Sequence, residues 1–267
     1  MVSNPTRIVY SALFGGYEDL QEQPLASSSG YKFVLYTDRP TSSPGGWEIR
    51  RVAPRFPLDP VRSARYLKIR GNAYVHEFDE SLWIDNRVVL RGDLDRLFGL
   101  RGTFDIAIPA HSYRGELREE FRAVIDSGFD DPARIRQMYK IADHFEVLHM
   151  QTLWTGMLIR GKSDKLSAAM ERWLELLLLA SRRDQLSVHC GLTAEAVEYR
   201  TLELDNYRSE YHRWIAPDSI SRSGRIRFWR PEYRRPALRV ADHIRSSNIG
   251  RAINRRLNRT GLSLPRW

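Results

Sequence analysis

The sequence has one cysteine, Cys190, among its 267 residues. A single thiol cannot form an internal disulfide, and it excludes a zinc site built from several cysteines. Secreted frameworks that depend on disulfides are therefore excluded, and a reducing, cytoplasmic setting is the simplest expectation.

Long apolar runs are missing as well. The longest, residues 174–180, is interrupted by Glu175 and is far shorter than the roughly 20 residues of a membrane-spanning helix. The N-terminal stretch has one short apolar run interrupted by Arg7 and no small-residue cleavage site, so we expect no secretory signal. The chain also lacks internal repeats, and its length suits one large α/β domain, with or without a tail.

Lysine is absent from the C-terminal part of the chain, whereas arginine is abundant there. From Arg213 to the end there are fourteen arginines against three acids, a surplus of eleven; since the whole chain carries +9, the remainder is close to neutral at about −2. Such a tail indicates an anionic surface, either lipid or nucleic acid. We therefore divide the chain into a domain of residues 1–210 and a basic, helical extension of residues 211–267.

Apolar residues of this extension recur close to helical spacing between its arginines. A helix of this kind would lie in the headgroup layer of a membrane, with its apolar face inserted. The alternative is that the helix packs on the domain and its arginines are merely solvated. The apolar positions are Leu238, Ala241, Ile244, Ile249, Ala252, Ile253 and Leu257.

Short apolar runs alternate with helical patterns through the first two-thirds of the chain, which is typical of a mostly parallel sheet flanked by helices. Two helices are predicted to begin at Asp59-Pro60 and Asp131-Pro132, where the acid caps the helix and proline occupies its first position. Residues 163–180 predict a further long helix. The predicted strands are residues 7–13, 31–36, 47–52, 81–84, 104–108 and 153–159.

Polar residues and glycines follow three of these strands, at the edge where open α/β sheets bind ligands. Asp85 follows the Trp83-Ile84 strand, and hard oxygen ligands such as its carboxylate suit Mg²⁺ and Mn²⁺. Asp38 is placed to bond a ribose hydroxyl or a base nitrogen, and Gly15-Gly16 would let a ligand approach the backbone closely. An ordinary acid at a strand-to-turn junction explains Asp85 equally well.

Two further groups break the apolar pattern. Arg62, Arg65 and Lys68 recur every three residues on the helix after Asp59, so they share one side and could meet a diphosphate. A solvated helix face is the alternative. Asp184-Gln185 follows the long helix, where a turn or cap would also account for the acid.

Five ordered blocks of sequence together resemble a known family, the glycosyltransferase-like domain of plant mucilage and pollen-development proteins, which also occurs in bacteria. The resemblance covers roughly residues 8–190, and a further block containing His111, Arg114, Glu119 and Glu120 is similar as well. Residues 83–98 also resemble family 8 glycosyltransferases. The five blocks are residues 10–17, Tyr36-Thr37-Asp38, residues 59–69, Trp83-Ile84-Asp85 and residues 183–187.

Both resemblances imply a GT-A fold, a nucleotide-sugar donor and glycosyl transfer to a hydroxyl of a glycan or lipid-linked glycan, as in polysaccharide biosynthesis. Asp85, with or without Mn²⁺ or Mg²⁺, would stabilise the leaving nucleotide diphosphate together with the basic helix. Asp184 would be the general base of an inverting enzyme or the donor-orienting acid of a retaining one. The other expected site residues are Gly15, Gly16, Tyr17 and Asp38 for the nucleoside; Arg62, Arg65, Lys68 and Arg87 for the phosphates; and His111, Arg114 and Gln185 for donor or acceptor sugar.

One position departs from the family 8 pattern, in which the strand ends Asp-X-Asp. Arg87 stands at the third position, where a guanidinium cannot bind a metal but can pair with a phosphate. Either Asp85 still holds a metal with other ligands, or Arg87 partly replaces the metal's charge. The literal Asp93-Leu94-Asp95 lies at a predicted helix start and is interpreted as a capping pair.

A non-catalytic nucleotide-binding or nucleic-acid-binding protein is the alternative, because the tail is rich in arginine. The tail's aromatic residues Phe228, Trp229 and Tyr233 are clustered and not interleaved along a basic groove, and no known nucleic-acid-binding motif is present, so nucleic acid is disfavoured. We therefore predict a cytoplasmic enzyme that is peripheral on the inner face of the cytoplasmic membrane.

Overall fold

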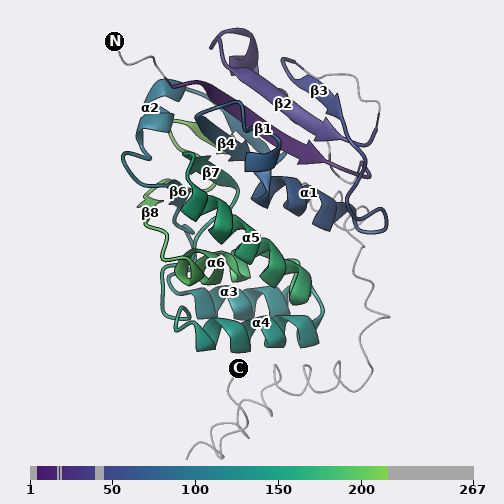
Figure 1. Cartoon of the computed structure of the whole chain (residues 1–267), viewed down its shortest axis with the longest axis vertical. Helices are drawn as coiled ribbons and strands as arrows, with labels where there is room; N and C mark the ends of the chain where they lie inside the picture. The colour runs from purple at the N-terminus through teal and green to yellow at the C-terminus, as the bar shows by residue number, and fades with distance from the viewer. Residues whose placement is uncertain (1–4, 17, 19, 40–44, 216–267) are drawn as a thin grey trace, which may run out of the picture.

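The computed structural model describes residues 5–16, 18, 20–39 and 45–215 (Figure 1). Tyr17 and residues 216–267 of the predicted basic extension, residues 211–267, lie outside the described residues, so the calls on them remain sequence predictions. Among the described residues, no helix is long and apolar enough to cross a membrane.

A seven-stranded sheet forms the centre of the molecule, in the order β3-β2-β1-β4-β7-β6-β8. Its strands are β1 (Arg7–Leu13), β2 (Lys32–Thr37), β3 (Glu48–Arg51), β4 (Glu80–Ile84), β6 (Ile106–Pro109), β7 (Met157–Arg160) and β8 (Tyr199–Leu202). Only β7 runs against its neighbours β4 and β6; the other pairs are parallel. The carboxyl ends of six strands therefore share one edge. This confirms the predicted α/β architecture with a mostly parallel sheet.

Alternate residues of the strands feed two apolar cores, as the two-residue period of a strand requires. On one face, Ile8 and Tyr10 pack with residues of α1 (Pro60–Ile69), α5 (Asp164–Leu179) and α6 (Val188–Ala194). Trp173 of α5 is fully buried there, as the apolar face of this helix predicts.

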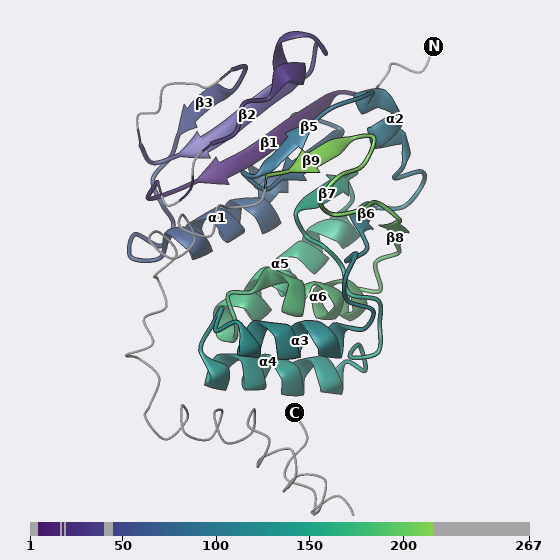
Figure 2. The ribbon, with the colours of Figure 1, turned by 180° about the vertical axis from the view of Figure 1, so that it is seen from behind.

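The opposite face is covered by α2 (Leu94–Gly99) and by a two-stranded ribbon of β5 (Val88–Leu90) and β9 (His212–Trp214), which Figure 2 shows in front of the sheet. β9 pairs with β5 along its whole length. Residues just after the predicted division at residue 210 therefore contact the ribbon, and the Ile215 N–H donates to the Arg87 carbonyl at 2.8 Å.

A third apolar cluster lies away from the sheet. It joins α3 (Leu117–Asp126) and α4 (Pro132–His144) to the C-terminal half of α5 and to α6. These four helices stack below the sheet in Figure 1. The layer is connected to the sheet edge by the short 3₁₀ turn Asp184–Leu186, which places Asp184 and Gln185 between α5 and α6.

Candidate active site

Asp85 lies at the carboxyl edge of the sheet, directly after the buried strand β4. Its backbone N–H donates to the carbonyl of Gly156, and the indole Nε1 of Trp83 donates to Oδ1 at 2.9 Å. The Asp85 side chain is 29% exposed, although the residues before it are buried. The strand therefore holds a carboxylate at a fixed position that remains accessible from solvent.

Helix α1 brings two cations to this carboxylate. The helix begins as predicted, with the Asp59 side chain accepting from the N–H of Arg62 and Pro60 at its first position. One turn apart, Arg65 and Lys68 point to the sheet edge: Lys68 Nζ lies 3.1 Å from Asp85 Oδ1, and Arg65 Nη1 lies 3.6 Å from the same atom.

Lys68 is fully buried and lies between two carboxylates. Besides Asp85, its Nζ is 2.6 Å from Oδ2 of Asp184 and 3.2 Å from the hydroxyl of Thr155. Burial lowers the pKa of the Lys68 ammonium, while the charges of Asp184 and Asp85 oppose that shift. Two carboxylates within 3.1 Å favour the charged form of this lysine.

Asp184 is the most enclosed acid of the site, with a side chain only 2% exposed. Arg65 Nε lies 3.1 Å from its Oδ1, and Thr155 donates to its Oδ2 at 2.9 Å. Burial by itself would raise the pKa of Asp184, but the charges of Arg65 and Lys68 outweigh burial and hold this pKa well below its usual range. Asp184 is therefore ionised, and its side chain is held in place by Arg65, Lys68 and Thr155.

The structure thus brings together four predicted site residues: Asp85, Asp184, Arg65 and Lys68. Two acids and two cations, paired at distances of 2.6 to 3.6 Å, form a neutral, preorganised group at the ligand-binding edge of the sheet. Such a group can offer donors to an incoming anion and acceptors to the hydroxyls of a sugar.

A divalent cation finds few ligands here. Among the described residues, no three His, Cys, Asp or Glu side chains gather in a way that could hold a metal ion. Asp85 is the one partly exposed carboxylate of the group, and its Oδ1 already accepts from Trp83 and Lys68. Lys68 and Arg65 place positive charge at 3.1 and 3.6 Å from this same oxygen.

Arg62, the first residue of the predicted basic stripe, does not join this group. Its Nη1 lies 3.0 Å from Oδ2 of Asp59, at the start of α1. Because Arg62 lies nearly two turns before Lys68, only the last two cations of the stripe reach Asp85.

Arg87 turns away from the acids as well. Its Nε lies 3.3 Å from Oε1 of Glu18, and its Nη1 contacts the carbonyl of Ile215. In this structure Arg87 is paired with Glu18, whereas Lys68 and Arg65 of α1 are the cations beside Asp85. Thr155, which donates to Asp184 and accepts from Lys68, was not expected at the site. It lies within residues 153–159, which were predicted to be one strand, but β7 begins only at Met157.

The Gly15-Gly16 turn and Asp38 lie at the ends of the neighbouring strands β1 and β2. Both glycines have positive φ, +68° and +61°, and a Cβ on Gly15 would lie 2.8 Å from the Pro60 ring. Asp38 accepts the Gly15 N–H at 3.0 Å. The absence of a side chain at Gly15 therefore lets the start of α1 pack closely against this turn. Asp38 holds the turn in place by accepting the Gly15 N–H.

His111, Arg114 and Gln185 form a second group beside the first. Arg114 Nη1 lies 2.5 Å from His111 Nε2 and 2.9 Å from Oε2 of Glu120, a buried acid whose pKa is raised by burial. Burial and the nearby cations Arg114 and Arg183 lower the pKa of His111 to about 4, so this ring is neutral at neutral pH.

Gln185 connects this second group to Asp184. Its Oε1 accepts from Arg183 Nη2 at 3.2 Å, and the same Arg183 atom lies 4.0 Å from Glu120. His111 and Arg114 therefore contact each other, whereas Gln185 is linked to Arg114 only through Arg183 and Glu120.

Comparison with known proteins finds similarity in structure but not in sequence. No protein-family model matches the sequence, and no curated protein matches it, so the resemblances to the plant mucilage family and to family 8 remain predictions. The chain resembles the apo structure of the bifunctional glycosyltransferase WbbM at 10% identity and a TM-score of 0.46, over 76% of this chain and 39% of that one.

A second similar structure is core-mannan synthase A (CmsA/Ktr4) from Aspergillus fumigatus in its Mn/GDP form. It is 8% identical with a TM-score of 0.44, over 75% of this chain and 73% of that one. The function proposed below therefore rests on the side chains of the site.

Proposed function

We propose that this protein transfers a sugar from a nucleotide diphosphate sugar to a hydroxyl of a glycan or lipid-linked glycan. The observation that carries the proposal is the buried Lys68, held between Asp85 and Asp184 with Arg65 alongside, at the carboxyl edge of the sheet. Burying a lysine and an acid costs free energy, so their retention at this edge indicates a role in chemistry.

The reaction breaks the bond between the sugar's anomeric carbon and a phosphate oxygen, and the electron pair stays on the diphosphate. The acceptor oxygen bonds to the anomeric carbon and loses its proton. Catalysis mainly requires stabilisation of the charge growing on the diphosphate. The Arg65 side chain is 17% exposed, and its Nη1 lies 3.6 Å from Asp85 Oδ1. Arg65 would donate hydrogen bonds to the phosphates, and the buried Lys68 would add positive charge from the protein interior.

Asp184 fits the donor-orienting role better than that of a general base. A base needs a pKa near the working pH and access to the acceptor hydroxyl. The pKa of Asp184 is held far below that range, and the side chain is enclosed by Lys68, Arg65 and Thr155. In the proposal it fixes Lys68 and Arg65 beneath the donor.

Asp85 provides the accessible acceptor of the site. It would bond a donor hydroxyl or, as the sequence predicts, hold Mn²⁺ or Mg²⁺ against the diphosphate. Because Lys68 and Arg65 already supply positive charge at its Oδ1, we propose that the metal is dispensable. The neighbouring Gly15-Gly16 turn with Asp38, at the ends of β1 and β2, would border the nucleoside.

The test uses purified full-length protein and a panel of uridine, guanosine and other nucleotide diphosphate sugars. Slow release of the nucleotide diphosphate from at least one donor supports the proposal, since water replaces the missing acceptor. Tight binding of nucleotide diphosphates without release from any donor would instead favour the non-catalytic nucleotide-binding alternative.

A further inference from the structure

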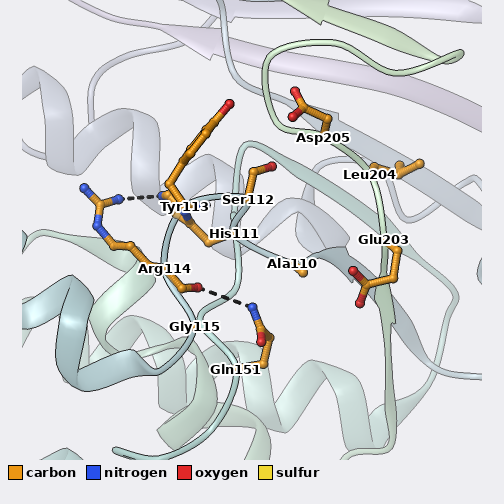
Figure 3. A pocket seen from close by; sticks show the side chains of 10 residues that line it. All are labelled: Ala110, His111, Ser112, Tyr113, Arg114, Gly115, Gln151, Glu203, Leu204 and Asp205. Atoms are coloured by element: carbon orange, nitrogen blue, oxygen red, sulfur yellow. Dashed lines mark hydrogen bonds between the residues drawn. The ribbon is translucent and has the colours of Figure 1, made fainter.

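A cavity of about 540 Å³ opens at the carboxyl ends of β6 and β8, on the same sheet edge as Asp85. Its volume falls in the range of small-molecule sites. Figure 3 shows two facing loops: residues 110–115 after β6 and residues 203–205 after β8, with Gln151 at the base.

The two loops are fixed to each other by one buried side chain, Asn206. Its Oδ1 accepts the Ser112 N–H at 2.8 Å, its Nδ2 donates to the Ala110 carbonyl at 2.8 Å, and its own N–H donates to the Ser112 hydroxyl at 2.8 Å. The cavity is therefore built into the fold and needs no partner to form.

An exposed aromatic ring, Tyr113, lines the cavity, and a second exposed ring contacts it. Tyr113 is 62% exposed and meets the edge of Tyr207, itself 46% exposed, at a centroid distance of 5.4 Å. Tyr207 is supported from the other side by Trp214 at 5.3 Å. Aromatic rings this exposed do not contribute to a core. They can stack on the apolar C–H face of a sugar ring, while the hydroxyls at the edge of the sugar remain free to form hydrogen bonds.

Hydrogen-bond acceptors for such hydroxyls lie across from the aromatic wall. Glu203 is exposed, and Asp205 is positioned by the N–H groups of Tyr207 and Arg208, which donate to its Oδ1 at 2.8 and 3.0 Å. Charge-assisted hydrogen bonds to carboxylates are stronger than neutral ones.

The same charges exclude an anionic ligand. Among the described residues that line the cavity, Arg114 is the cation, and it is paired with Glu120; His111 is neutral at neutral pH. Two carboxylates without a free counter-charge repel phosphates and acidic sugars. The cavity therefore differs in charge from the group around Lys68 and Arg65, whose cations suit a diphosphate.

We infer that this cavity binds a sugar ring without acidic groups, stacked on Tyr113 and Tyr207 and hydrogen-bonded to Glu203 and Asp205, as the acceptor subsite. The acceptor role rests on the proposed function, whereas the binding of sugar does not. Glu120 and Arg183 form a chain of charged side chains between the cavity residue Arg114 and Asp184 of the proposed donor site. His111 and Arg114 then shape the cavity wall.

The experiment is a glycan array with immobilised oligosaccharides of three classes: neutral, amino-sugar-containing and uronic-acid-containing. Full-length wild type is expected to bind glycans without acidic groups. Tyr113→Ala and Tyr207→Ala should weaken that binding about tenfold or more, whereas Tyr113→Phe should stay within about threefold. Leu179→Ala, at an equally exposed position outside the cavity, is the matched control and should bind as wild type.

Selection of uronic acids, no binding to any glycan, or unchanged binding by both alanine variants would overturn the inference. Donor hydrolysis is measured on the same proteins. Hydrolysis without glycan binding refutes the subsite alone, whereas glycan binding without hydrolysis of any donor refutes the glycosyltransferase proposal and leaves a sugar-binding cavity.

Discussion

Lys68 is the residue on which the site depends, because a fully buried ammonium is stable only where carboxylates surround it. Asp85 and Asp184 provide them at 3.1 and 2.6 Å. The lysine is also the cation that both acids share most closely, although Asp184 also contacts Arg65 and Thr155 and Asp85 also contacts Trp83 and Arg65. The three side chains therefore act as one unit.

The internal cations predict weak dependence on metal. Wild-type donor hydrolysis should stay within about threefold in excess chelator, whereas Lys68→Met should lose about 10²–10³ in rate, the usual cost of removing a group that stabilises developing charge. Lys165→Met, an exposed lysine of α5, is the control and should keep wild-type activity. Complete loss in chelator that Mn²⁺ restores, together with an active Lys68→Met, would contradict this prediction.

The sequence predicted which residues belong to the site better than it predicted the contacts that these residues make. Asp85, Asp184, Arg65 and Lys68 were all named, because strand ends and a three-residue helical stripe are local patterns. The structure places these four side chains next to one another. The partners of Arg87 and Arg62 were not predicted. Glu18 and Asp59 capture them through loop and cap geometry that no periodicity reports.

At the scale of elements, the placement of α1 determines the position of both cations. The helix packs against β1 and α5, and its first turn meets the Gly15-Gly16 turn, where a Cβ on Gly15 would lie 2.8 Å from Pro60. The glycine is therefore needed for two reasons, its positive φ and the space it leaves.

Two glycine substitutions separate these reasons. Gly30 also has positive φ, +73°, but no atom lies within 4 Å of its would-be Cβ. Gly30→Ala should cost only the left-handed backbone penalty, about 1–2 kcal/mol. Gly15→Ala should cost more and should weaken nucleotide diphosphate binding, because α1 must shift with Arg65 and Lys68.

Urea unfolding gives the stability of both variants, and calorimetry gives the nucleotide affinity. Equal destabilisation by the two substitutions, with nucleotide affinity unchanged in Gly15→Ala, would show that α1 does not depend on this contact.

Elements with explicit signals were predicted well. β1 spans the predicted residues 7–13, and α1 and α4 start at the predicted prolines, because caps and apolar runs act locally. β5, β8 and β9 were not predicted. They are three or four residues long and are stabilised by pairing with segments far away in the chain, such as β9 with β5.

At the scale of the whole molecule, buried histidines make the stability depend on pH. His189 of α6 is buried: its Nε2 donates to the Gln151 carbonyl at 2.8 Å, and its Nδ1 faces the Tyr199 hydroxyl. Burial lowers its pKa to about 4. The unfolded chain takes up a proton below about pH 6.5 and the folded protein does not, so stability is lost as pH falls from about 6.5 towards 4.

From this group alone, the free energy of unfolding should fall by about 3 kcal/mol across that window. His189→Gln should be less stable at pH 7 but should lose about 3 kcal/mol less on acidification. His144→Gln, at an exposed position, should follow the wild type. Urea unfolding at pH 7, 5.5 and 4.5 measures this, and parallel pH profiles of wild type and His189→Gln would be the contrary result.

The Arg-rich segment of residues 236–267 supports a further prediction from sequence. We propose that it associates with anionic membranes, where each arginine near the surface contributes about 1 kcal/mol. Full-length protein should float with anionic liposomes at low salt, less so at high salt, and not at all once residues 236–267 are deleted. Full-length protein that ignores these liposomes at low salt would refute the association.

The acid at the end of β4 is proposed to serve nucleotide-sugar chemistry and not the fold. Asp85→Asn keeps the size of the side chain and removes its charge, so the protein should stay folded while transfer, measured as nucleotide diphosphate release, falls at least about 10²-fold. Asp95→Asn is the control, since Asp95 belongs to the literal Asp-X-Asp, is 74% exposed and pairs with Arg7. A folded Asp85→Asn variant as active as Asp95→Asn would contradict the claim.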